Sequence, residues 1–296
     1  MCKIAGGIFH PNETNQAKKI IVAGRTIIKC AEQVNKDATG IAIVNPTGIH
    51  VYKNSKTASD FVKDEAFFDF VTHHANEDTI AFIGHCRFAT QGSNQDNSNN
   101  HPIIDRPIYG VHNGVITNDT EIAKEYGTCA DVDSAVMFSM LKRLSNNKPL
   151  TAKSFTTAMN KLRGSATIVA VDERDPTKIF IGLKNNPMNL VKVDDVLWFA
   201  STHDILADFI NVMGYADADL YINSIKNIKN YSARVFTQKS VSHDWFKKSS
   251  KYKLDAPVFT ATKYQSFGKS VTDYDYENFY KQLKFDKDDT AFLDRG

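Results

Sequence analysis

The chain has 296 residues, 42% of them apolar and 24% charged, and a formal net charge of +2. This length and balance are typical of a globular protein with a buried core. The small net charge gives no sign of a nucleic-acid or membrane-surface partner, and the longest apolar runs are far too short to span a bilayer. Because no apolar signal segment follows Met1, we expect a cytoplasmic protein with reduced cysteines.

Strand-like and helical patterns alternate in the first half of the chain. Apolar residues at helical spacing predict a first helix that ends near Val34. The stretch 91–100 is rich in Gly, Ser, Asn, Asp and Gln, and is expected to be a loop. In this half, strands are expected at 2–9, 40–45, 48–53, 79–84 and 108–112, and helices at 16–34, 58–61, 65–74, 131–144 and 152–162.

The second half is richer in strands, expected at 166–171, 178–183, 189–193, 196–200 and 233–237, with a short helix near 205–212. Strands at both ends with helices between them favour a layered α+β fold over alternating βαβ units. From residue 241 the composition becomes basic, polar and aromatic, so we expect one domain over 2–240 and a C-terminal extension over 241–296. The role of this extension is open, and its many Tyr and Phe residues favour an ordered segment.

The four cysteines, Cys2, Cys30, Cys86 and Cys129, are scattered, with no C-x-x-C pair and no histidines at zinc spacing. We therefore expect no metal site and no cofactor. Of the four cysteines, Cys2 is the candidate nucleophile, because removal of Met1 would leave a thiol and an α-amine on one residue. That amine titrates near about 7.7–8.0 and can take the thiol proton directly or through a water. The simpler alternative is a small apolar residue at the start of a strand.

Three further segments follow Cys2 in a fixed order. They are 84–92 (G-H-C-R-F-A-T-Q-G), 99–102 (N-N-H-P) and 112–116 (H-N-G-V-I). Together with Met1-Cys2 they resemble the class II glutamine amidotransferase family, and most closely the glutaminase domain of glucosamine-6-phosphate synthase. The usual family pattern is G-H-T-R-W-A-T-H-G, then N-A-H-P, then H-N-G-x-I. The resemblance extends to roughly residue 240 and implies a four-layer αββα sandwich of the N-terminal-nucleophile hydrolase type.

The resemblance implies a chemistry as well as a fold. Cys2 would attack the side-chain amide of L-glutamine and form a thioester, releasing ammonia. The Asn113 side chain and the Gly114 N–H would stabilise the tetrahedral oxyanion. Without the family order, Asn-Gly is more commonly a hairpin turn.

The remaining implied residues would hold the substrate. Arg87 would bind the α-carboxylate, because a guanidinium can engage both oxygens, with a surface salt bridge as the alternative. Asp133 would hold the α-amine, although an acidic residue at a helix start is favourable without any ligand. The loop residues Phe88, Thr90, Gln91 and Gly92 would close over glutamine.

The chain departs from the family pattern at several of these positions. Lys3 replaces a glycine, Phe88 a tryptophan, Gln91 a histidine and Cys86 a threonine, and the loop is one residue longer. The family's R-G-x-D-S-A-G segment appears as 34–40 and keeps only its aspartate, Asp37, and its last glycine. These changes bear on loop closure and on coupling to a partner site.

No second catalytic domain is recognisable after residue 240, so we expect ammonia to pass to a separate synthase subunit, docked through the C-terminal extension. Two alternatives remain. One is an N-terminal-nucleophile hydrolase of another small amide, which Arg87 and Asp133 oppose because together they read an α-amino acid. The other is a catalytically silent fold that acts as a binding or regulatory subunit. A conventional hydrolase with a Cys86 nucleophile served by His85 or His101 is disfavoured. Adjacent strand residues point to opposite faces, so His85 is poorly placed to activate Cys86.

Overall fold

The computed structural model describes residues 2–10, 16–128, 130–241 and 250–254. Cys129 and almost all of the expected C-terminal extension, including its aromatic residues from Phe259 onward, lie outside the described residues.

A seven-stranded antiparallel sheet forms one layer and has the N-terminal strand near its centre. Its order is β11 (Lys226–Asn227), β9 (Asn189–Val193), β10 (Val196–Ala200), β1 (Lys3–Phe9), β4 (Ala81–Arg87), β2 (Ala38–Asn45) and β3 (Gly48–Asn54). β1 pairs with β4 on one side, Lys3 opposite Cys86, and with β10 on the other, Ala5 opposite Ala200. The first residues of the chain are therefore held between two strands.

A six-stranded antiparallel sheet forms the second layer. Its order is β13 (Ser250–Lys253), β12 (Ser232–Phe236), β8 (Ile179–Lys184), β7 (Gly164–Asp172), β6 (Ile108–Ile116) and β5 (Ile103–Asp105). β13 pairs with β12, Lys253 opposite Ser232, so residues beyond 240 add an edge strand to this sheet.

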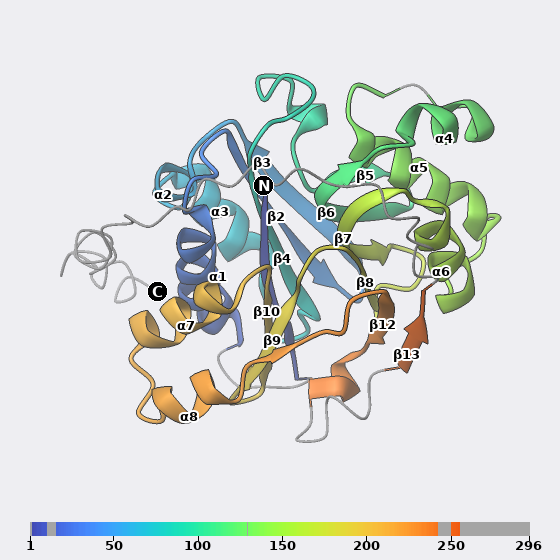
Figure 1. Cartoon of the computed structure of the whole chain (residues 1–296). Coiled ribbons are helices and arrows are strands. Elements are labelled where there is room, and N and C mark those ends of the chain that lie inside the picture. Colours follow the sequence, from blue (N-terminus) through green and yellow to red (C-terminus); the bar gives the residue numbers. More distant parts are fainter. Residues whose placement is uncertain (1, 11–15, 129, 242–249, 255–296) are drawn as a thin grey trace, which may run out of the picture. The chain divides into compact units, whose positions relative to one another are not determined.

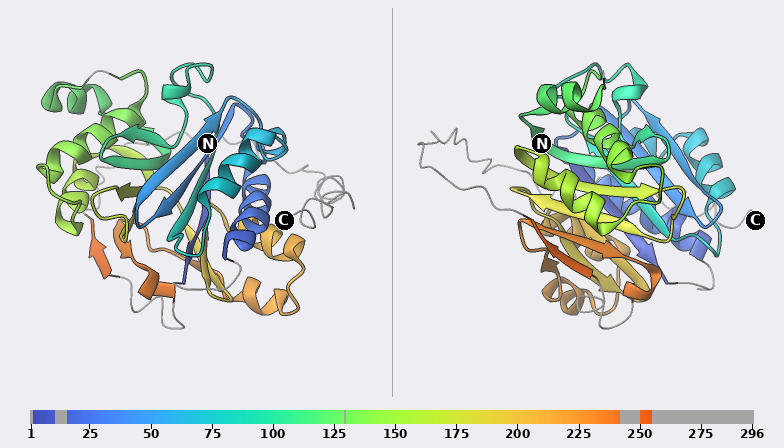
Figure 2. Two further views of the ribbon diagram at one scale, coloured as in Figure 1. Left: turned by 180° about the vertical axis from the view of Figure 1, so that it is seen from behind. Right: turned by 90° about the vertical axis from the view of Figure 1, so that its right-hand side faces the viewer.

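Helices cover the outer face of each sheet (Figures 1 and 2). On the seven-stranded sheet these are α1 (Gln16–Glu32), α2 (Ala58–Phe61), α3 (Glu65–His74), α7 (His203–Met213) and α8 (Ala218–Asn223). On the six-stranded sheet they are α4 (Asp119–Tyr126), α5 (Asp133–Ser145) and α6 (Ala152–Lys161). The layers thus run helix, sheet, sheet, helix, and the predicted αββα sandwich is confirmed.

Apolar cores between the described elements hold the layers together. Between the sheets, alternate residues of the strands point inward, among them Ile4, Val111 and Leu197. A second core joins the six-stranded sheet to α5 and α6 through Phe138 and Phe155. Burial of these side chains is the main favourable contribution to folding.

Several boundaries differ from the sequence-based expectation. The first helix ends at Glu32 because Gln33 adopts a left-handed φ of 41°, which leaves Val34 57% exposed. α4 was not expected, and it ends at Gly127, whose φ of 66° suits a left-handed C-cap. Within the described residues, no helix combines the length and the apolar character that crossing a membrane would require.

Candidate functional site

Cys2 lies at the entrance to β1, next to the end of β4. The Phe88 N–H donates to the Cys2 Sγ at 3.3 Å. Burial raises the pKa of the Cys2 thiol, and the Phe88 N–H and the Arg87 charge offset only part of this rise. The thiol is therefore protonated near neutral pH, and a nucleophilic role requires a base to remove its proton.

Asn113 and Gly114 lie inside β6, not in a hairpin turn. They face Thr167 and Ala166 of β7 in the ladder. Gly114 has a φ of 145°, and a Cβ there would fall 2.0 Å from the Ser165 carbonyl oxygen, so only glycine fits. The hairpin alternative for this Asn-Gly pair is therefore wrong.

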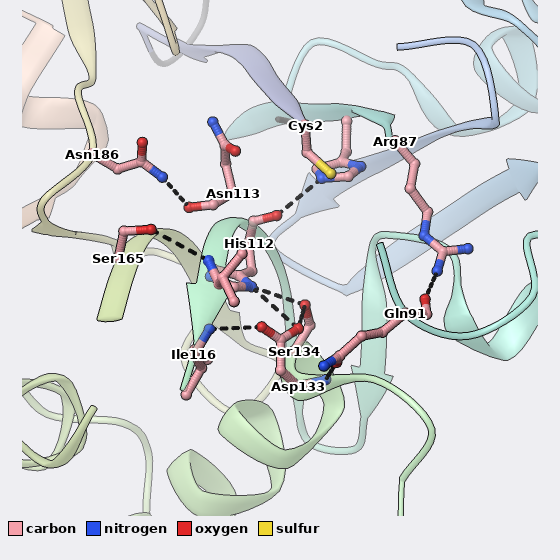
Figure 3. A network of polar contacts seen from close by, with 12 residues as sticks. Cys2, Arg87, Gln91, His112, Asn113, Ile116, Asp133, Ser134, Ser165 and Asn186 are labelled. Atoms are coloured by element: carbon pink, nitrogen blue, oxygen red, sulfur yellow. Dashed lines mark hydrogen bonds and ion pairs between the residues drawn. The ribbon is translucent and has the colours of Figure 1, made fainter. Parts of the chain in front are cut away.

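Asn113 is held through both its main chain and its side chain. Its main-chain carbonyl oxygen accepts a hydrogen bond from the Asn186 Nδ2 at 2.7 Å (Figure 3). Its Nδ2 donates to the Ser201 Oγ at 3.5 Å, and that hydroxyl also accepts from the Ile4 N–H at 2.8 Å. Ser201 thus ties β6 to β1, the strand that follows Cys2.

Arg87, the last residue of β4, is 4% exposed, so it is not the partner in a surface salt bridge. Its Nη1 donates to the Asn100 Oδ1 at 2.9 Å. Its Nη2 donates to two main-chain carbonyl oxygens, of Gln91 at 2.5 Å and of Gly92 at 3.1 Å. All three acceptors are neutral oxygens of the loop that follows β4.

Asp133 is the first residue of α5, and its carboxylate does not cap that helix. The Oδ2 accepts from the Ile116 N–H at the end of β6, at 2.8 Å. The Oδ1 accepts from the Ser134 hydroxyl at 3.2 Å. The helix start therefore supplies a favourable dipole, while the side chain itself is directed at the β6 end.

A small pocket brings most of these residues together. Seven of the nine residues expected from the sequence line it: Cys2, Arg87, Phe88, Thr90, Gln91, Gly114 and Asp133. Gly92 and Asn113 do not line it. Gly92 accepts a hydrogen bond from the lining residue Arg87, and Asn113 lies between the lining residues His112 and Gly114 in the chain. The pocket is also lined by residues not expected: Asn99, His101, His112, Val132 and Ser134.

Three buried histidines lie at the pocket, and two of them, His101 and His112, line it. The His85 and His101 rings stack with centroids 4.1 Å apart, and the His85 Nε2 lies 3.0 Å from the His112 carbonyl oxygen. Burial lowers the pKa of all three, that of His85 to about 3. They are neutral near pH 7, so each donates or accepts according to its tautomer.

The geometry also opposes a Cys86 nucleophile. Cys86 is fully buried, and its Sγ lies 3.6 Å from the Ile28 carbonyl oxygen of α1, whereas His85 is directed at β6. Burial raises the pKa of this thiol well above its ordinary value. Within the part of the chain that the structure describes, no group of three or more His, Cys, Asp or Glu residues could hold a metal ion.

The positioning residue Asn186 carries no sequence signal of its own, whereas Ser201 ends the segment 198–201, which resembles a strand end of the family. Asn186 follows another asparagine in a loop after β8, and Ser201 follows β10. Their roles depend on which strands become neighbours across the two sheets, which periodicity does not reveal. His112 was at least marked by its place directly before Asn113.

The chain is similar in sequence to two longer enzymes. It is 29% identical over 193 residues to a glutamine–fructose-6-phosphate aminotransferase (isomerizing) of Staphylococcus epidermidis, and 30% identical over 195 residues to that of Staphylococcus aureus. Each match covers 64% of this chain and 30% of the relative, so the chain matches less than a third of their length. No protein-family model matches.

Two solved structures share the fold. One is the glutamine phosphoribosylpyrophosphate amidotransferase of B. subtilis, with a TM-score of 0.56 and 14% identity over 85% of this chain and 49% of that one. The other is described as the allosteric regulatory enzyme of purine biosynthesis, with a TM-score of 0.58, 13% identity and the same coverage. The sequence similarity and the shared fold confirm the resemblance of this chain to the class II, N-terminal-nucleophile glutamine amidotransferases.

Proposed function

We propose that the chain hydrolyses the side-chain amide of L-glutamine to glutamate and ammonia, with Cys2 as the nucleophile. The observation that supports this most is the pocket itself. It brings together Cys2 from just before β1, Arg87 from the end of β4, Asp133 from the start of α5 and Gly114 from within β6. These are a thiol, a cation, a main-chain donor and an anion, the groups that reading and cleaving an α-amino acid amide requires.

Recognition would use the two charged residues. Arg87 would bind the α-carboxylate and Asp133 the α-ammonium, because each offers the opposite charge and directional hydrogen bonds. The loop residues Phe88, Thr90, Gln91 and Gly92 would cover the bound substrate. An amide without an α-amino acid head group would lose both contacts, which argues against a general small-amide hydrolase.

The chemistry follows from the position of Cys2. After removal of Met1, the α-amine takes the thiol proton, and Sγ attacks the amide carbon. The oxyanion is stabilised by the Asn113 side chain and the Gly114 N–H. The proton then moves to the leaving nitrogen, the C–N bond breaks, and ammonia departs from a glutamyl thioester. Water adds to the thioester, and the C–S bond breaks to release glutamate and the thiol.

The ammonia acceptor is proposed to lie on a separate synthase subunit. The curated relatives that the chain matches are longer enzymes, and the match covers 30% of their length. The expected extension is the proposed docking segment for that subunit. Truncation after Leu254 keeps β13 in its sheet, and a truncated chain that still co-purifies with its partner would defeat the docking part. A reducing cytoplasm would keep Cys2 a free thiol.

The test is glutamate release from glutamine by the purified chain and by Cys2→Ala, with the N-terminus checked by mass. We expect release by the chain lacking Met1 and none by the variant. Release that persists in Cys2→Ala would sink the proposal. A panel of small amides run alongside separates a glutaminase from a broader amide hydrolase.

A silent binding subunit is the second candidate, because the loop carbonyls already occupy donors of Arg87. It predicts glutamine binding, measured by calorimetry, without glutamate release from a chain whose Met1 is absent. That result, reproduced with added cell extract as a source of partner, would favour it over the glutaminase.

A further inference from the structure

Gln91 joins the two residues proposed to read the substrate. Its main-chain carbonyl oxygen accepts from the Arg87 Nη2 at 2.5 Å, and its side-chain Oε1 accepts from the Asp133 N–H at 3.3 Å. Figure 3 shows the Gln91 side chain running from the neighbourhood of Arg87 to Asp133. One residue therefore spans the pocket from the end of β4 to the start of α5.

This arrangement uses donors that a bound carboxylate needs. A guanidinium carries two hydrogens on each terminal nitrogen and one on Nε. On Arg87, Nη2 already donates to Gln91 and Gly92, and Nη1 donates to Asn100. A carboxylate that binds in the bidentate manner across both terminal nitrogens must displace the loop carbonyls from Nη2.

The outer part of the loop segment 91–100 is anchored away from the pocket. The Asn94 Nδ2 donates to the Asp37 carbonyl oxygen at 2.7 Å, and the Asn97 Nδ2 donates to the Lys53 carbonyl oxygen at 2.8 Å. The Asn100 Nδ2 donates back to the Asn94 carbonyl oxygen at 2.7 Å. The loop segment is thus fastened at its outer side to Asp37, just before β2, and to β3, and at its inner side to Arg87 and α5.

We propose that Gln91 is a latch that holds the loop segment 91–100 across the pocket before glutamine binds. Glutamine must displace the latch contacts before the loop residues can cover it. Gln91 is then a positioning residue that opposes substrate binding through Arg87. Its side chain supplies the contact to α5, and the position is one where the chain departs from the family histidine. Only the expected effect on KM rests on the proposed glutaminase function. The expected hydrogen exchange does not.

The side chain can be tested apart from the main chain. Gln91→Met keeps the length of the side chain and removes the acceptor, while Gln91→Glu keeps an acceptor oxygen for the Asp133 N–H. Hydrogen exchange of the main-chain amides in 91–100 is measured in glutamine-free wild type and in both variants. A lost hydrogen bond of ordinary strength predicts roughly 2- to 10-fold faster exchange in Gln91→Met and wild-type exchange in Gln91→Glu. Amides of β7 serve as the internal reference.

Kinetics give the second measurement. We expect KM for glutamine to fall roughly 2- to 10-fold in Gln91→Met, with kcat changed less, because the substrate no longer competes with the latch. Unchanged exchange in Gln91→Met overturns the latch, and so does a KM that rises, since the side chain would then bind glutamine itself. If the wild type releases no glutamate, the proposed function fails, while the exchange comparison still decides whether the latch exists.

Discussion

Asn186 fixes the main chain of Asn113 by donating its side-chain amide to the Asn113 carbonyl oxygen at 2.7 Å, and both residues are buried. This contact sets the position of the proposed oxyanion donors, because Asn113 and Gly114 share the strand that it holds.

Replacement of Asn186 is expected to act on the rate more than on binding. Asn186→Leu removes the donor and leaves the Asn113 carbonyl oxygen without it, so the oxyanion donors shift from their aligned positions. We expect kcat for glutamate release to fall roughly 10-fold or more, with KM changed less. The matched control is Asn211→Leu at an exposed position of α7. Equal kcat in the two variants would contradict the positioning role.

The Cys2 thiol is expected to react with a pH dependence that its burial determines. Because burial raises its pKa above the ordinary value of 9.0, the thiolate fraction keeps growing across the whole range from neutral to pH 9. In the chain that retains Met1, alkylation of Cys2 by iodoacetamide should accelerate roughly 10-fold per pH unit over that range. Peptide mass analysis assigns the label, and Cys2→Ala provides the blank. A plateau below pH 8 would show that the site stabilises the thiolate.

Lys53 is expected to orient the Arg87 guanidinium indirectly, through Asn100. Its Nζ donates to the carbonyl oxygens of Asn100 at 2.7 Å and Pro102 at 2.9 Å, and the Asn100 side chain accepts from Arg87. Lys53→Met should therefore raise KM for glutamine roughly 3- to 10-fold by misorienting the guanidinium. Lys56→Met, which removes an exposed ion pair with Asp64, is the control and should leave KM unchanged.

The titration of Lys53 is expected to make the binding of glutamine depend on pH. Burial lowers the pKa of Lys53 to about 8, so its ammonium holds the two carbonyl oxygens below that pH and is lost above it. Wild-type KM should rise between pH 8 and 9 faster than that of Lys53→Met. Parallel pH profiles of the two proteins would show that another group causes the rise.

Lys184 is expected to contribute to stability rather than to activity. This residue is 7% exposed, and its Nζ donates to carbonyl oxygens of Leu162 at 2.5 Å and Met159 at 3.4 Å, at the C-terminal end of α6. Lys184→Met should lower the free energy of unfolding by about 1–3 kcal/mol, since charged donors to helix-end carbonyls are lost. Urea unfolding measures this. Lys161→Met on the exposed side of α6 should have a smaller effect, and equal effects would refute the capping role.

Much of the fold could be predicted because its strands are short and strongly apolar. β4 and β6 were expected at 79–84 and 108–112, but each strand runs on past its expected end, β4 to Arg87 and β6 through the Asn113-Gly114 pair to Ile116. The expected domain boundary at residue 240 remains a prediction. β13 was not expected, because a short exposed edge strand with two lysines has no apolar alternation to mark it.

The site was predictable in its members but not in its hydrogen bonds. Motif order identified Cys2, Arg87 and Asp133 as candidates. It could not show that Arg87 donates to the loop carbonyls, because those acceptors are main-chain atoms that carry no residue identity. Nor could it reveal Asn186, whose contact joins residues 73 positions apart through the packing of the sheets.

The place of β1 between β4 and β10 has a practical consequence for anyone who purifies the protein. Cys2 is part of the pocket wall, so any peptide joined to its nitrogen starts there. An affinity tag fused ahead of Cys2 would crowd the entrance and block the amine even if the chain folds normally. Inactivity of such a tagged protein would then be caused by the tag and would say nothing about the enzyme. Activity is best measured on protein whose tag follows Gly296.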